Sequence, residues 1–176
     1  IPALNWNFEI SDWKNDSREI IELLTFLKQF DCRMVGFNNL GFDYPVLHTL
    51  MRMGYSDAKT LYDKAQAIIT SQDGQNRWAH MVYESDRYLS QLDLYKIHHF
   101  DNKARATGLK ALEFVMRLES IQDLPFPVGQ NLTQEQAEVL HEYNKHDVEA
   151  TKEFYFKTLP MIEFREELTA KYRRDF

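Results

Sequence analysis

The chain has 176 residues, 44% hydrophobic and 14% aromatic, which suits one globular domain, 1–176, with a single core. Its formal net charge of −6 argues against broad electrostatic binding of nucleic acid, but not against a cleft that grips one short strand around cations. The single cysteine, Cys32, excludes a disulfide framework and a cysteine-based zinc cluster. Without a secretory pattern or a long apolar run, the chain is expected to be cytoplasmic and to have no membrane partner.

Strands and helices are predicted to alternate along the first half of the chain. A strand is expected over 6–11, and a helix near Asp16, which with Glu19 has the form of a capping box. The apolar stripe of that helix recurs at helical spacing: Ile20, Leu23, Leu24 and Leu27. A short strand over 33–37 then leads into a turn over 38–41.

The next predicted helix begins around Asp43. Pro45 falls in its first turn, where a missing N–H costs least, and Gly54 is expected to cap its C-terminus. A further helix is predicted over 56–70, and the polar stretch 71–76 is predicted to be a loop.

The second half begins with a predicted strand over 88–95, and 78–83 is a further candidate strand. A helix is predicted over 108–118, followed by an irregular, Pro-rich connection over 124–129. Because strands alternate with helices, the sequence favours an α/β architecture.

A long helix is predicted to close the chain. Thr133 and Gln136 form a second capping box, and the helix is expected to run toward Thr158 and to break at Pro160. Its stripe recurs at spacings of three and four and should face the protein: Leu140, Tyr143, Asp147, Ala150 and Phe154.

Two residues of this stripe carry chemistry. Tyr143 and Asp147 are four positions apart, so their side chains leave the same face of the helix. An unpartnered carboxylate is very costly to bury, and a metal ion would remove that cost. The stripe therefore indicates a metal site around Asp147.

A second carboxylate, Asp43, falls at the junction of a strand, a turn and a helix. Taken alone, Asp43 could serve simply as the N-cap of that helix, which is a common role for aspartate. In the pattern Asn38-x-x-x-Phe42-Asp43-x-Pro45, however, it resembles the second exonuclease motif of the proofreading domains of family B DNA polymerases.

Tyr143-x-x-x-Asp147 resembles the third motif of the same domains, and the resemblance covers residues 5–160. It points to the DEDD superfamily of 3′–5′ exonucleases, with a ribonuclease-H-like mixed sheet flanked by helices, and to stand-alone exonucleases of bacteriophage replication. In the histidine subtype a histidine stands five positions before the last aspartate. That position is Glu142 here, and His141 and His146 are out of register, so the tyrosine subtype is favoured.

The resemblance implies a mechanism with two divalent cations, Mg²⁺ or Mn²⁺, held by carboxylates. Asp43 and Asp147 would be metal ligands that meet around the shared cations, and Tyr143 would orient the attacking water by hydrogen bonding. A phenol with a pKa near 10 is a poor base at neutral pH. The implied reaction is hydrolysis at the 3′ end of single-stranded DNA in a bacterial or phage-infected cell, with a DNA polymerase or another replication protein as a partner.

Four further residues have two possible roles each. Phe42 could stack on a terminal base or fill the core. Asn38 and Asn39 could contact the nucleic-acid strand or brace the turn, and the motif spacing favours Asn38 as the motif residue. Lys110 could contact phosphate or lie on the surface as basic residues commonly do.

The first motif of the family, Asp-x-Glu, does not occur before Asp43, and the nearest imitation is Asn7-Phe8-Glu9. The short stretch between Glu9 and Asp43 leaves no room for the two antiparallel strands that the family fold places there. We therefore expect 6–11 to be the third strand of the sheet, with the first two strands and the motif upstream of Ile1. Two alternatives stay open: a catalytically inactive nucleic-acid-binding or scaffolding module of the same fold, and a 3′–5′ exoribonuclease.

Overall fold

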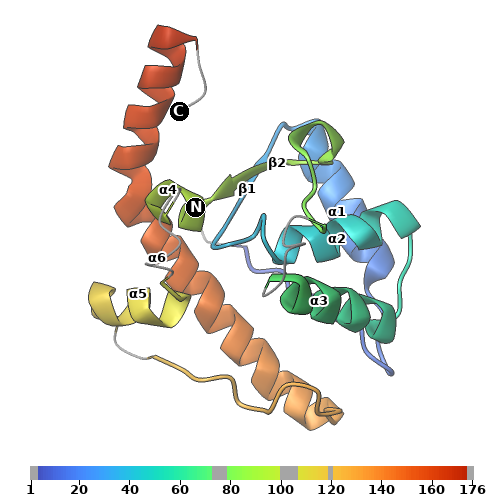
Figure 1. Ribbon diagram of the computed structural model, residues 1–176. Helices are drawn as coiled ribbons and strands as arrows, with labels where there is room; N and C mark the ends of the chain where they lie inside the picture. Colours follow the sequence, from blue (N-terminus) through green and yellow to red (C-terminus); the bar gives the residue numbers. More distant parts are fainter. Residues whose placement is uncertain (1–3, 73–78, 100–106, 119–120, 174–176) are drawn as a thin grey trace. The chain divides into compact units, whose positions relative to one another are not determined.

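The computed structural model of the chain describes residues 4–72, 79–99, 107–118 and 121–173 (Figure 1). It is a mostly helical α/β structure, in which the described residues fold into two compact units, Ile1–Leu92 and Asp93–Phe176. The described elements, in chain order, are α1 (Ser17–Gln29), β1 (Arg33–Gly36), α2 (Asp43–Met53), α3 (Ala58–Gln72), the short 3-10 helix η1 (Glu84–Asp86), β2 (Ser90–Asp93), α4 (Leu94–His99), α5 (Leu109–Met116) and α6 (Gln134–Tyr172).

The first helix, α1, begins one residue after Asp16, but the predicted capping box is wrong. The Asp16 carboxylate instead accepts a hydrogen bond from the backbone N–H of Glu9 at 2.8 Å and pairs with Lys14 at 2.7 Å. Asn15 accepts from the Ser17 N–H at 3.0 Å in its place. The preceding loop, rather than the helix itself, therefore uses the carboxylate.

The predicted stripe of α1 faces the interior of the first unit, with Leu24 buried and its other members partly buried. Helix α2 contacts both α1 and α3, and Gly54 ends α2 in the left-handed conformation at φ 73°, as predicted. The core of this unit consists of Leu24, Tyr44, Leu50, Ile68 and Leu89. The hydroxyl of Tyr44 also accepts a hydrogen bond from the Tyr88 N–H at 2.7 Å, which ties α2 to the segment that leads into β2.

Two parallel strands, β1 and β2, form the sheet of the described residues. The first matches the strand predicted over 33–37 to within one residue, and the turn over 38–41 follows it. The second is shorter than the predicted 88–95, because its last residues belong to helix α4. The strand predicted over 88–95 is therefore confirmed over 90–93 and wrong at its two ends, 88–89 and 94–95.

Two predicted strands do not form. Over 6–11 the chain is irregular apart from one antiparallel bridge between Ile10 and Asn15. Trp6 is 57% exposed, so its indole ring is not packed against a core as that of a sheet strand would be. The candidate strand over 78–83 is turn and coil where it is described, from 79 onward, and most of the loop predicted over 71–76 lies outside the described residues.

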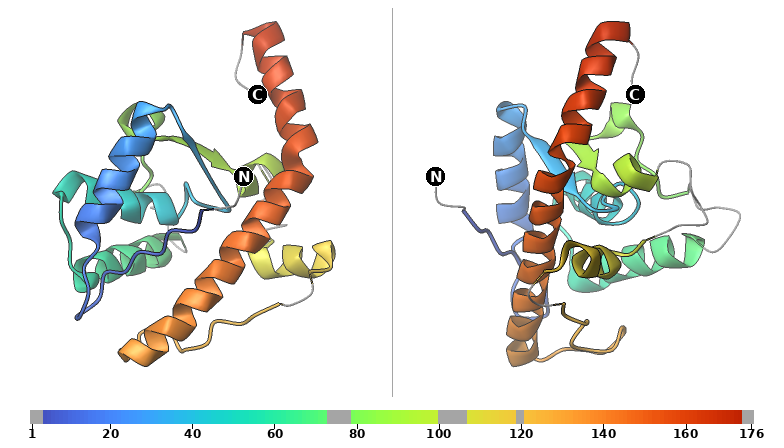
Figure 2. Two further views of the ribbon diagram at one scale, coloured as in Figure 1. Left: turned by 180° about the vertical axis from the view of Figure 1, so that it is seen from behind. Right: turned by 90° about the vertical axis from the view of Figure 1, so that its left-hand side faces the viewer.

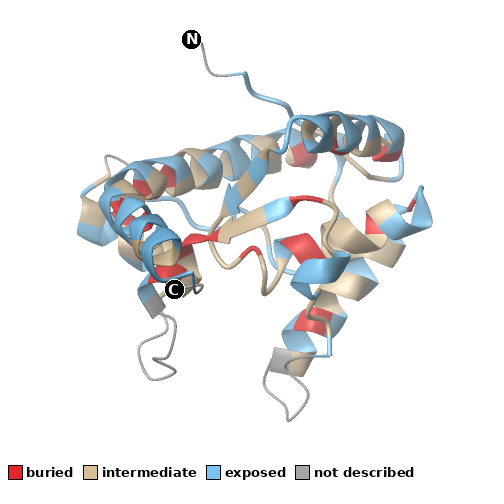
Figure 3. Ribbon diagram, turned by 90° about the horizontal axis from the view of Figure 1, so that it is seen from above, coloured by how far each residue is buried: buried red, intermediate tan, exposed pale blue. Residues whose placement is uncertain are grey.

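In the second unit, α4 and α5 both pack against the long helix α6. Both views in Figure 2 place α5 beside the N-terminal half of α6. Buried positions, red in Figure 3, lie along one side of α6, while much of its remaining surface is exposed. The core of this unit consists of Leu94, Ile97, Ala137, Ala150, Phe154 and Ile162.

The capping box at the start of α6 is confirmed. Thr133 Oγ1 accepts from the Gln136 N–H at 3.3 Å, and Gln136 Oε1 accepts from the Thr133 N–H at 3.0 Å. The predicted break at Pro160 is wrong, because α6 continues to Tyr172. Contacts beyond the proline hold the helix in place: Ile162 is buried, and the Arg165 guanidinium donates to the carbonyl of Ile97 at 2.9 Å.

Among the described residues, no helix combines the length and the apolar character that a bilayer crossing requires. The irregular, Pro-rich connection predicted over 124–129 is confirmed, and Gly129 adopts a left-handed φ of 87° there.

Candidate functional site

The turn between β1 and α2 carries four of the predicted site residues. Asn38 stands at its start in the left-handed conformation with φ 57°, which asparagine tolerates better than most residues. Its carbonyl accepts hydrogen bonds from the N–H groups of Gly41 and Phe42 at 3.0 and 3.1 Å. A Cβ on Gly41 would lie 2.5 Å from Oδ1 of Asn38, so a larger residue at that position would displace the Asn38 amide from its place in the turn.

Asn39 braces this turn. Its side chain is 6% exposed and donates from Nδ2 to Oε1 of Gln91 on β2 at 2.9 Å, while its backbone carbonyl accepts from the Tyr44 N–H at 2.8 Å. Phe42 is partly buried. The contacts of Asn39 are those of a residue that braces the turn, and contact with a nucleic-acid strand by Asn38, Asn39 or Phe42 stays a prediction.

Asp43 is the first helical residue of α2, and Phe42 is the N-cap. The N-cap alternative for Asp43 is therefore wrong. Its exposed carboxylate lies in the first turn of the helix, where the partial positive charge of the helix N-terminus favours an anion. The turn thus presents a carboxylate at the surface of its unit.

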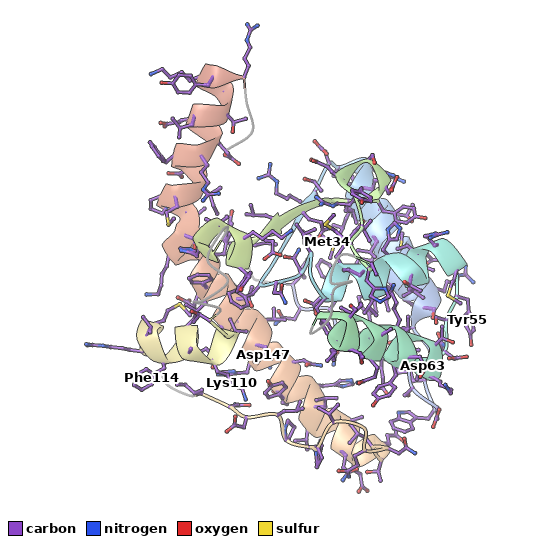
Figure 4. The ribbon with its side chains drawn as sticks, viewed as in Figure 1. Met34, Tyr55, Asp63, Lys110, Phe114 and Asp147 are labelled. Carbon is purple, nitrogen blue, oxygen red and sulfur yellow. The ribbon has the colours of Figure 1, made fainter. Side chains whose placement is uncertain are left out.

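In the second unit, Asp147 lies on the part of α6 that α5 packs against (Figure 4). Its predicted stripe is confirmed, because Ala150 and Phe154 are buried while Leu140, Tyr143 and Asp147 are partly buried. The carboxylate of Asp147 therefore lies along an apolar face, as the spacing of the stripe predicts.

Tyr143 and Asp147 interact directly. The pKa of Tyr143 is raised, first by burial and then by the charge of Asp147 and a hydrogen bond to its carboxylate. The phenol therefore keeps its proton at neutral pH and donates to Asp147. Glu142, the residue at the position of the subtype-defining histidine, is exposed and pairs with Lys145 at 3.5 Å.

Helix α5 adds a second carboxylate to this face. One ligand atom each from Glu113, His146 and Asp147 lies within 4.8 Å of the others, an arrangement that could hold a metal ion. His146 and Asp147 are three and four positions after Tyr143, so all three residues belong to one side of α6. The cluster thus combines two carboxylates and an imidazole with a neighbouring phenol.

Glu113 is the most unusual member of this cluster. It is 0% exposed, and neither carboxylate oxygen has a hydrogen-bond partner among the described residues. Burial raises its pKa; the His146 and Lys110 charges lower it, and the Asp147 charge raises it. A buried carboxylate without a donor is costly, and a cation held beside it would offset that cost.

Lys110, the basic residue of α5, carries a charge that acts on Glu113 of this cluster. Its ammonium pairs with Asp123 at 2.5 Å, and that hydrogen bond is the main cause of its raised pKa; the charges of Tyr143 and Asp147 contribute less. This exposed ion pair is typical of a surface lysine, and contact of Lys110 with a phosphate stays a prediction.

Glu113 and His146 are not among the site residues predicted from the sequence. Glu113 could have been found by the reasoning that found Asp147, because it stands on the apolar stripe of its helix: Leu109, Leu112, Glu113 and Met116. His146 was considered only as a subtype marker. Asp43 and Asp147 belong to different units, so their expected meeting around shared cations stays a prediction.

Comparisons of the chain with protein-family models, with curated proteins and with solved structures find no match. The functional conclusion therefore depends on the motifs of the sequence and on the local geometry around Asp147.

Proposed function

We propose that the chain is a metal-dependent 3′–5′ exonuclease of the tyrosine subtype, with a ribonuclease-H-like architecture. Its substrate is the 3′ end of single-stranded DNA, in association with a replication protein such as a DNA polymerase. The observation that supports this most is the pair formed by Tyr143 and Asp147, which share a hydrogen bond on the protein-facing side of α6. Glu113 adds a buried carboxylate with an oxygen within 4.8 Å of a carboxylate oxygen of Asp147.

The residues at Asp147 fit a divalent cation. Carboxylate oxygens are the ligands that Mg²⁺ and Mn²⁺ prefer, and the buried oxygens of Glu113 have no hydrogen-bond donor within the part of the chain that the structure describes. Divalent cations at such a site supply water activation and neutralise charge on the scissile phosphate. Asp43, the exposed carboxylate of the second motif, is proposed as the ligand from the first unit.

Tyr143 is proposed to orient the attacking water rather than to take a proton from it. Its pKa is raised, so the hydroxyl stays protonated and can donate to Asp147 while its oxygen accepts from a water. Phe42 and Asn38, at the turn before Asp43, are proposed to contact the terminal nucleotide, the ring by stacking and the amide by hydrogen bonding.

Release of labelled nucleotides from 3′-labelled single-stranded DNA tests the proposal directly. With Mg²⁺ or Mn²⁺ the protein should release mononucleotides, and Asp147→Asn should slow release by about 10³-fold or more, since a lost ligand disrupts the metal site. Glu142→Gln, an exposed substitution on the same helix, is the matched control and should leave the rate unchanged.

Asp43 is tested in the same assay. Asp43→Asn should reduce release by a similar factor, whereas Asp63→Asn, on the surface of the same unit, should not. Release that survives Asp147→Asn at the wild-type rate would reject the proposed site. A common loss in Asp43→Asn and Asp63→Asn would point to folding instead of ligation.

A second function has one observation in its favour. No Asp-x-Glu pair precedes Asp43, so two of the family's carboxylates do not occur in this part of the sequence. A catalytically inactive module would bind 3′-labelled DNA without releasing nucleotides at any metal concentration. A parallel reaction with RNA tests the exoribonuclease alternative, because an exoribonuclease would degrade RNA and leave DNA intact.

A further inference from the structure

Glu113 is a buried carboxylate that the proposed exonuclease motifs do not use. Its side chain is 0% exposed, and both of its oxygens lack a hydrogen-bond partner among the described residues. Proteins normally satisfy a buried carboxylate with donors or with an opposite charge, because its desolvation is otherwise uncompensated. A cation bound beside Glu113 would supply a direct partner that the donors among the described residues do not provide.

The surroundings of Glu113 supply two further ligand groups. A nitrogen of His146 and a carboxylate oxygen of Asp147 lie within 4.8 Å of each other and of a Glu113 oxygen. Ligand atoms around one cation at about 2.1 Å stand about 3 to 3.5 Å apart, so small side-chain rotations would close the set. The three ligands come from α5 and α6, which pack against each other within one unit.

The donor set has a chemical preference. Oxygen-only sites suit Mg²⁺ and Ca²⁺, whereas an imidazole nitrogen favours transition metals such as Zn²⁺ and Mn²⁺. Three protein ligands also leave positions open for water or a phosphate oxygen, as in catalytic rather than structural metal sites.

We propose that Glu113, His146 and Asp147 form a three-ligand site that binds Zn²⁺ or Mn²⁺ in preference to Mg²⁺. The inference rests on the proposed function in that both use Asp147, and it extends that site with two ligands from outside the exonuclease motifs. A bound cation would place a positive charge beside the buried carboxylate of Glu113. The imidazole of His146 would favour Zn²⁺ or Mn²⁺ over Mg²⁺ at this site.

Titration of the metal-free protein with Zn²⁺, Mn²⁺ and Mg²⁺, followed by calorimetry, tests the ligand set. The wild type should bind Zn²⁺ at least about 10²-fold more tightly than Mg²⁺. Glu113→Gln should weaken all three metals at least tenfold, because it removes a charged oxygen. His146→Gln should weaken Zn²⁺ and Mn²⁺ tenfold or more and leave Mg²⁺ within about threefold, which erases the preference.

Two substitutions serve as matched controls, Glu142→Gln for Glu113→Gln and His141→Gln for His146→Gln, and both should bind metals as the wild type does. Wild-type affinities in both Glu113→Gln and His146→Gln would overturn the proposal. A structural role for Glu113 predicts the opposite thermal response from a ligand role. If Glu113 is a ligand, Glu113→Gln should melt no lower than the metal-free wild type but lose the metal-induced rise in melting temperature. A lower metal-free melting temperature would contradict it.

Pulsed electron paramagnetic resonance of the Mn²⁺-loaded wild type needs no variant that might misfold. A directly bonded nitrogen should give a hyperfine coupling, and His146→Gln should remove it while His141→Gln keeps it. A wild-type spectrum with water and carboxylate ligands only would overturn the proposal.

The nuclease assay separates the failure of this inference from failure of the proposed function. Nitrogen-coupled Mn²⁺ without release of 3′ nucleotides would retain the metal site and reject the exonuclease. Release that depends on Asp147, together with unchanged metal affinity in Glu113→Gln and His146→Gln, would retain the exonuclease and reject the three-ligand site.

Discussion

Tyr143 keeps its proton because burial and the carboxylate of Asp147 both raise its pKa. Its contribution to catalysis is therefore expected to be a positioned hydrogen bond rather than proton transfer. Tyr143→Phe removes the hydroxyl without leaving a cavity. It should lower the single-turnover rate of 3′ nucleotide release by about 10²-fold, while metal affinity stays within a few-fold of the wild type.

Tyr155→Phe is the matched control for this prediction, since Tyr155 lies on the same helix and packs beside Phe156. It should cleave at the wild-type rate. A large loss of metal affinity in Tyr143→Phe, with the rate restored at saturating metal, would instead show that the phenol only shapes the carboxylate of Asp147.

His48 links stability to pH in the first unit. Its ring packs between those of Tyr44 and Tyr88, with centroids 5.9 and 5.2 Å away, and its buried Nδ1 has no hydrogen-bond partner among the described residues. Burial, and next the charge of Arg52, lower its pKa below 6.5. Because the folded state resists protonation, the associated stability is present above pH 6.5 and is lost as pH falls through the lowered pKa.

His48→Phe should therefore reduce the loss of melting temperature between about pH 7.5 and pH 5, since the unfolded state no longer gains that proton. His80 contributes in the same window, because burial and Lys64 lower its pKa, so some pH dependence should remain. An unchanged pH slope in His48→Phe would show that the ring titrates equally in the folded and unfolded chains.

At the scale of elements, α6 shows tertiary contacts overriding a local signal. Pro160 cannot donate a backbone hydrogen bond, which costs about 3 kcal/mol in a helix interior, yet the helix runs on to Tyr172. Burial of Thr158 and Ile162 on either side of the proline, and the hydrogen bond from Arg165 to α4, keep the helix continuous through Pro160. No short-range pattern in the sequence contains those contacts.

Pro160→Ala should consequently stabilise the helical unit by about 1–3 kcal/mol, because it restores a backbone donor inside a continuous helix. Urea denaturation followed by circular dichroism measures the change, with Lys157→Ala as an exposed control on the same helix. A loss of stability in Pro160→Ala would indicate that the helix needs a bend at the proline.

Local signals predicted the elements well where the deciding contacts are near in sequence. Two confirmed predictions, the capping box of Thr133 and Gln136 and the left-handed Gly54, depend only on contacts within one turn of helix. The segment 6–11 needs a partner strand to become a strand, and its sequence alone does not supply one. Asp16 was misjudged for a related reason, because the preceding loop competes for its carboxylate.

The candidate site divides in the same way. Asp147 and Tyr143 were predicted from their spacing on one helix, since helical periodicity fixes which residues share a face. Glu113 and His146 join them only because α5 packs on α6, which spacing within α6 cannot reveal. The apolar stripe of α5 alone would have indicated Glu113, but not that it lies beside His146 and Asp147.

At the scale of the whole molecule, the net charge of −6 limits how the protein can hold a polyanion. Binding of single-stranded DNA should depend on divalent metal and on few lysine–phosphate contacts. The logarithm of the binding constant should therefore fall with the logarithm of salt concentration at a slope no steeper than about −2, measured by fluorescence anisotropy. A steep slope without metal would indicate a basic binding surface and contradict this account.

The most direct test of the central claim is X-ray diffraction at the manganese absorption edge from crystals grown with Mn²⁺ and a 3′-terminal dinucleotide. The account predicts an anomalous peak about 2.0–2.3 Å from a carboxylate oxygen of Asp147, with Asp43 as a ligand of the same pair of ions. Asp147 without manganese, or Asp43 directed to a region that holds neither metal nor nucleotide, would contradict it.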